Sequence, residues 1–186
     1  MIRPVYIVDI FEDIVKKVST KLLPQLQAIP KSTITGVHYL YGHYNEIQRR
    51  LIEKGNSNTE QYNRYPLIAL FQDFSIKKGS NQLGFYGEAN LQFMILYHTK
   101  PAAYSETRME NVFKPILYPI YFEFLNQIKK TGKFHLYSDK GIDHEQIDRP
   151  NWGRIGSYGN DGYILDDVLD GIEIKNLILK TRLKIC

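Results

Sequence analysis

Cysteine is almost absent from this sequence: Cys186 is the only one among 186 residues. A single cysteine cannot form an internal disulfide or a metal site built from several thiolates, so both are excluded. No run of about 18 apolar residues occurs, so we expect no transmembrane helix and no membrane partner. The first residues, Met1–Ile7, are too short and too soon interrupted to form a signal peptide. These absences are consistent with a reducing compartment.

A concentrated positive charge is also missing. Lys and Arg total 24 against 20 Asp and Glu, which gives a net charge of +4, and the basic residues occur as short scattered pairs such as Lys16-Lys17. Nucleic-acid-binding proteins usually gather positive charge on one face or stripe. We therefore do not expect sequence-specific binding of DNA or RNA.

Motifs typical of enzymes are missing as well. Gly153, Gly156 and Gly159 do not have the spacing of a dinucleotide-binding or Walker loop, and no Lys-Ser/Thr pair follows them. Ser105 and Ser157 do not lie in a nucleophile elbow. The sequence therefore predicts a protein that is not an enzyme, with no catalytic residue, no cofactor and no metal.

Two polar clusters are the residues best suited to metal or acid–base chemistry. Their members are Asp161, Asp166, Asp167, Asp170 and Glu173 in the first, and Asp139, Asp143, His144, Glu145 and Asp148 in the second. Oxygen ligands of this kind suit divalent cations, but the spacing matches no calcium loop. We interpret both clusters as solvated loops. A metal-dependent enzyme that uses His144 with the carboxylates of residues 139–148 remains the alternative.

Tyrosine is plentiful: 14 Tyr and 9 Phe accompany a single Trp. A tyrosine ring with its polar tip suits protein interfaces and half-buried strands alike, and both interpretations stay open. A third hypothesis is a single-stranded nucleic-acid-binding protein. There Tyr39 and Tyr41 would stack on bases beside Arg49-Arg50.

Hydrophobic periodicity predicts an α+β fold in one domain, residues 1–186. The first elements expected are a helix Asp9–Leu22 with an Asp9–Glu12 capping box and ended by Pro24, a strand Thr33–Tyr44, a segment Ile47–Ile52 that either continues this strand or begins a short helix, and a polar loop Glu53–Arg64. Strands Pro66–Ile76 and Phe85–Tyr97 then form a long hairpin. The remaining elements are a helical segment Ser105–Lys130 kinked by Pro115 and Pro119, a short strand Phe134–Tyr137, an irregular stretch Ser138–Gly162, and a last strand Leu169–Ile185 with a bulge near Asn176. One mostly antiparallel sheet packed against two helices follows. Two helices cannot cover both faces of a long sheet, so part of it should remain for a neighbouring subunit.

The hairpin and the only tryptophan supply the candidate contact residues. These are Phe71, Phe74, Lys77, Lys78, Phe85, Tyr86, Arg149 and Trp152. A tryptophan between Pro and Gly can anchor in a partner's pocket. It can equally pin a surface loop to its own core, and the sequence does not separate the two.

Three strings carry a resemblance to a known family: Tyr65-Pro66-Leu67-Ile68-Ala69-Leu70, Arg108-Met109-Glu110-Asn111-Val112-Phe113-Lys114-Pro115-Ile116-Leu117 followed by Tyr118-Pro119-Ile120-Tyr121, and Asp170-Gly171-Ile172-Glu173-Ile174. With the order of elements, they make the chain similar to the tail terminator, or tail-completion, proteins of the neck of tailed bacteriophages, especially those of Bacteroidetes phages.

The resemblance implies a virion protein without enzymatic activity, assembled in the host cytoplasm. It implies a homo-oligomeric ring, commonly of six copies, that ends the tail tube and joins it to the portal or connector proteins. DNA would pass through the lumen without sequence-specific binding. An adjacent connector ring of the neck remains the alternative role.

Overall fold

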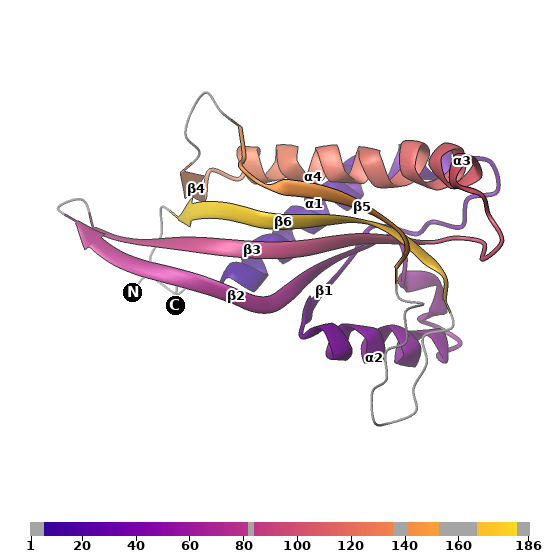
Figure 1. Ribbon diagram of the computed structural model, residues 1–186, viewed down its shortest axis with the longest axis horizontal. Helices are drawn as coiled ribbons and strands as arrows, with labels where there is room; N and C mark the ends of the chain where they lie inside the picture. Colours follow the sequence, from indigo (N-terminus) through magenta and orange to yellow (C-terminus); the bar gives the residue numbers. More distant parts are fainter. Residues whose placement is uncertain (1–5, 82–83, 136–140, 153–166, 182–186) are drawn as a thin grey trace.

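The computed structural model describes residues 6–81, 84–135, 141–152 and 167–181; within strands, residues 73, 78–81 and 84–86 are described by their backbone alone (Figure 1). In chain order the elements are α1 (Ile7–Gln27), β1 (His38–Gly42), α2 (Tyr44–Gly55), the 3-10 helix η1 (Gln61–Asn63), β2 (Leu67–Asn81), β3 (Gly84–His98), α3 (Ser105–Arg108), the π-helix η2 (Met109–Leu117), α4 (Tyr118–Lys130), β4 (Phe134–His135), β5 (Glu145–Trp152) and β6 (Leu169–Thr181).

The strands form one mixed sheet in the order β1-β2-β3-β6-β4, and β5 also pairs with β6. Only β1 and β2 are parallel, whereas every other pair is antiparallel. This confirms the α+β class and the mostly antiparallel sheet with a long hairpin. The prediction that residues 138–162 are irregular is wrong for β5, because its polar, mostly exposed side chains lack the apolar alternation by which strands are recognised.

Two hydrophobic cores lie on opposite faces of the sheet. The main core packs α1 and α4 against the strands, and the ring of Phe93 lies 4.6 Å from that of Phe11 and 5.1 Å from that of Phe124. A smaller core on the other face joins Ile47 and Leu51 of α2 to alternate residues of the strands. Of the two alternatives for Ile47–Ile52, the structure has the helix, which as α2 is longer than expected. The predicted loop Glu53–Arg64 is correspondingly shorter, since its first residues belong to α2 and residues near its end form η1.

The first helix is longer than its sequence signals indicate. Asp9 and Glu12 do not form a capping box; the backbone carbonyl of Tyr6 instead accepts bonds from the N–H groups of Asp9 and Ile10, each at 3.2 Å. Pro24 lies inside the helix rather than ending it. The last turn persists because Leu26 is buried in the main core and because the Ala28 N–H still bonds the Pro24 carbonyl at 3.2 Å.

The second helical segment runs without interruption from α3 through η2 to α4. At Pro115, where a kink was predicted, the structure has a π-helix. Its i→i+5 hydrogen bonds differ from the i→i+4 pattern that a proline breaks. Pro119 lies in the first turn of α4, where a missing N–H is tolerated. This geometry keeps one apolar stripe of the segment on the sheet.

The predicted bulge near Asn176 is confirmed. Leu91 pairs with Leu177 and Phe93 with Ile174, so one residue of β3 faces two residues of β6. Asn176 has a φ of 53°, in the left-handed region. β2 also shifts register between Phe71 and Ser75.

This backbone geometry predicts the effect of substitutions at Asn176. Asn176→Val should lower the free energy of unfolding by about 1–2 kcal/mol, because a β-branched residue is strained at positive φ. Asn176→Gly serves as the control and should lie within about 0.5 kcal/mol of the parent. Urea unfolding followed by circular dichroism measures both, and equal losses for the two variants would contradict the prediction.

Candidate assembly surface

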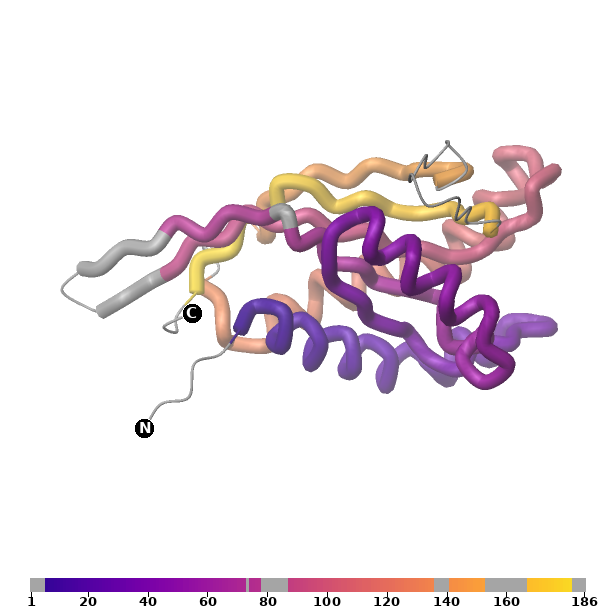
Figure 2. Tube along the Cα trace, turned by 90° about the horizontal axis from the view of Figure 1, so that it is seen from below, coloured from indigo at the N-terminus to yellow at the C-terminus, as the bar shows by residue number. Residues whose placement is uncertain are grey.

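The hairpin of β2 and β3 ends in an arm, residues 77–88, that extends past the helices (Figure 1). At the other side of the sheet β5 and β6 run side by side (Figure 2). β1 stops pairing with β2 at Phe71, and β6 stops pairing with β3 at Gly87. Among the described residues, β2 beyond Ser75 therefore pairs with β3 alone. Its outer edge presents backbone N–H and C=O groups that another strand can bind.

The predicted contact residues of the hairpin divide between this arm and the interior. Lys77 is exposed on the arm. The arm also includes Lys78, Phe85 and Tyr86, whose side chains are outside the described part of the chain. Phe71 was predicted to make contacts, but it is buried in the smaller core beside Tyr44, so it is not available on the surface. Phe74 is half-buried against the main core.

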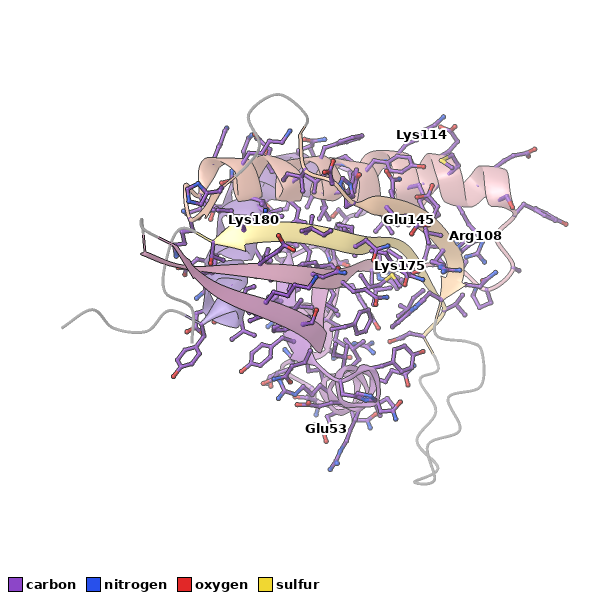
Figure 3. The ribbon with its side chains drawn as sticks, turned by 60° about the vertical axis from the view of Figure 1, so that its left-hand side comes forward. Glu53, Arg108, Lys114, Glu145, Lys175 and Lys180 are labelled. Carbon is purple, nitrogen blue, oxygen red and sulfur yellow. The ribbon has the colours of Figure 1, made fainter. Side chains whose placement is uncertain are left out.

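Beyond α2, the face of the sheet opposite α1 is polar. The charged side chains there form ion pairs, two of them across strands and one along β6. Glu88 and Lys180 lie 3.2 Å apart, and Glu173 contacts both Arg149 at 2.8 Å and Lys175 at 3.5 Å. Figure 3 shows Lys175 and Lys180 on β6. Such a surface favours a wet, specific contact over non-specific apolar association.

This face is hollowed at the register shifts of β2 and β6, which lie on the two sides of β3. The hollow has a volume of about 440 Å³ and is lined by Phe74, Ser75, Asn90, Leu91, Gln92, Lys175 and Asn176. Bulges bend strands and open the ladder locally. The hollow lies at the base of the arm and is continuous with the polar face.

Arg149 and Trp152 hold β5 in place within the chain. Arg149 bonds Glu173 through both Nε and Nη2 at 2.8 Å. The Trp152 ring meets the Tyr44 ring edge-on, with centroids 5.4 Å apart, at the margin of the smaller core. These ring contacts agree with the second interpretation of the tryptophan, in which it packs against its own chain.

The first acidic cluster consists largely of ion pairs rather than of a solvated loop. Asp170 is 0% exposed and pairs with Arg108 at 2.5 Å, and buried Glu173 pairs with Arg149. Asp167 pairs with Arg64. The prediction of solvation is wrong for these buried carboxylates, because their arginines come from distant positions in the sequence. Asp161 and Asp166 lie outside the described residues.

The second cluster does not converge on a metal. His144 Nδ1 lies 2.7 Å from the Ile142 carbonyl oxygen, and Nε2 lies 2.6 Å from the Tyr121 hydroxyl. The Tyr118 hydroxyl donates to Asp148 at 2.6 Å, a bond that raises the pKa of Tyr118 to about 12. Asp139 lies outside the described residues. Within the part of the chain that is described, no group of three or more His, Cys, Asp or Glu side chains is placed to hold a metal ion.

The aromatic platform needed for single-stranded nucleic acid is incomplete. Tyr39 packs its ring against the main core, where burial raises the pKa of its hydroxyl, and Tyr41 is 38% exposed. Arg49 and Arg50 lie on α2 and form ion pairs with Glu53 and Glu46. Of these four residues, only Tyr41 therefore exposes its ring, and both guanidinium groups are already paired.

No protein-family model matches the chain. No curated protein matches it either. None of the helices described is long and apolar enough to cross a membrane. The arrangement of the arm, the sheet edges and the polar face is therefore the basis for the functional argument.

Sequence reasoning missed a second cavity, of about 380 Å³, beside η1 and the end of β3. Its polar residues include Arg64, Tyr65, His98 and Asp167. The Tyr65 hydroxyl donates to Asp167 Oδ2 at 3.1 Å, and burial raises the pKa of this tyrosine. The lining comes from four separate stretches of sequence, so no local motif marks it. Its two opposite charges, Arg64 and Asp167, neutralise each other.

Proposed function

We propose that this chain is a structural protein of a tailed bacteriophage. It forms a ring at the neck or at the head-proximal end of the tail, ends the tail tube, and joins the tube to the head connector. The sequence resemblance implies a ring that commonly has six copies. DNA passes through the lumen without sequence-specific contacts.

The observation that carries this proposal is the arm. A long two-stranded projection contributes little to the core of its own chain, and isolated hairpins are only marginally stable in water. Contact with a partner supplies the missing packing. The α+β fold and the hairpin also match the element order on which the resemblance rests.

The two sheet edges support closure into a ring. The β2 edge and the β5 edge lie on opposite sides of the sheet. A contact between two different surfaces of identical subunits repeats, and it closes into a ring when the rotation fits. The modest net charge of +4 suits a lumen through which DNA slides without tight binding.

Light scattering of the purified full-length chain, alone and with tail tubes and portal protein of the phage that carries its gene, tests the proposal. We expect a species of six times the 21.7 kDa chain mass that binds one end of the tubes. Capping of the tubes indicates a terminator, whereas binding to portal protein alone indicates a connector ring. A strictly monomeric chain that associates with neither would contradict the proposal.

A further inference from the structure

We propose that the arm of one copy adds to the outer edge of β5 in the next copy, so that the sheets of neighbouring subunits join through backbone hydrogen bonds. The inference rests on the proposed function in one respect, namely that copies of this chain assemble. It goes further by naming the two surfaces that meet.

The accepting surface is the edge strand β5. In the described part of the chain β5 pairs only with β6, so its other edge has no strand partner. Glu145, Gln146 and Asp148 are exposed along it. Pro150 lacks an N–H and Asn151 has a φ of 57°, which together limit strand addition to residues 145–149.

The donating surface is the outer edge of β2 from Ser75 to Asn81. β1 covers β2 only up to Phe71, and the register shift that follows directs the strand away from β1. The available lengths on the two edges are similar, since β5 offers five residues before Pro150 and β2 offers seven. Main-chain bonding of this kind is a recurring mode of recognition between chains.

Charge complementarity selects this pairing. The arm carries Lys77 and Lys78, whereas β5 carries Glu145 and Asp148. Among the described residues neither Lys77 nor Glu145 forms an ion pair, although both are exposed (Figure 3 labels Glu145). Opposite charges on neighbouring strands stabilise a sheet, and like charges destabilise it. Pairing either edge with its own copy would bring like charges together.

An exposed aromatic side chain adjoins the accepting edge. Phe122 on α4 is 64% exposed. Its ring lies 6.5 Å from that of Tyr118, whose hydroxyl bonds Asp148 of β5. A strand that adds to the edge of β5 would shield the Phe122 ring, which the single chain leaves in water.

Cross-linking between two single-cysteine variants tests the contact directly. Both carry Cys186→Ser; one also carries Lys77→Cys and the other Glu145→Cys. With a short bis-maleimide, the mixture should give a covalent dimer, whereas each variant alone should give little. Lys17→Cys mixed with Glu145→Cys is the matched control, because Lys17 is exposed on α1 away from both edges.

Charge reversal tests the energetic basis. Lys77→Glu and Glu145→Lys should each weaken self-association about tenfold, and the doubly reversed chain should recover most of that loss. Lys17→Glu makes the same charge change and should leave association unchanged. Sedimentation at several concentrations gives the constants.

The outcomes separate this inference from the proposed function. Oligomers that form without the Lys77–Glu145 cross-link, and that respond equally to Lys17→Glu and Lys77→Glu, overturn the inference and leave the ring intact. A chain that stays monomeric with and without tail tubes overturns both. A cross-link restricted to the mixture, together with rescue by the double reversal, supports the inference.

Discussion

Replacing Arg108 by alanine should lower the free energy of unfolding by about 3–5 kcal/mol, because it leaves a buried carboxylate without its partner. Arg108 is 4% exposed and Asp170 is 0% exposed. The guanidinium also donates to the backbone carbonyls of Ala103, Lys100 and Pro101 at 2.9–3.3 Å. These bonds connect the segment after β3 to the start of β6. Urea unfolding followed by circular dichroism measures the loss.

Two further variants make the test specific. Arg108→Lys keeps the charge but cannot reproduce the forked bonds, so its loss should be substantial but smaller than that of alanine. Lys114→Ala breaks only an exposed pair with Glu110 on the same helix, worth about 0.3–0.5 kcal/mol. Figure 3 shows both side chains. A loss below about 1 kcal/mol for Arg108→Ala would contradict the structural role given to this ion pair.

Removing the arm should strongly weaken assembly while preserving the fold. The variant replaces residues 77–88 by Asn-Gly, a sequence typical of two-residue hairpin loops, which joins the paired residues Ile76 and Ala89. We expect self-association to weaken by more than about 30-fold, the effect of losing a dominant interface element. Light scattering over a concentration series measures it.

The thermal unfolding midpoint controls for folding in the same variant. The two cores include Ile76 and Ala89 but no described side chain between them. The strand pairing with β6 that the deletion removes is that of Gly87 and Glu88 alone, so the midpoint should change by only a few degrees. The opposite pattern, normal association with a large loss of stability, would show that the arm serves the fold of its own chain and not its assembly.

The parts of the fold that could be predicted are those with strong apolar periodicity. The long hairpin and the bulge near Asn176 follow from alternating side chains, since one residue of phase shift moves every later side chain to the other face. The sequence left the segment of α2 open between a strand and a helix, because only Ile47 and Leu51 on its length are buried apolar residues. β5 was missed because an edge strand needs few apolar side chains.

The candidate surface was predicted less completely than the fold. The predicted strands, Pro66–Ile76 and Phe85–Tyr97, put Lys77 at the tip of the hairpin, whereas β2 runs on to Asn81 and forms the arm. They also did not show that Phe71 faces the smaller core. The arginine partners of Asp170 and Glu173 were also hidden, since they lie 62 and 24 positions away in the sequence. Pairing over such separations is determined by tertiary packing, which local patterns do not encode.

The most direct test of the central claim, assembly into a ring, is a reconstruction of the intact tailed particle of the phage that carries its gene. We predict a closed ring of identical copies at the head-proximal end of the tail, with each arm lying along β5 of the adjacent copy. Absence of the chain from the particle, or its presence only as isolated single copies, would contradict the account.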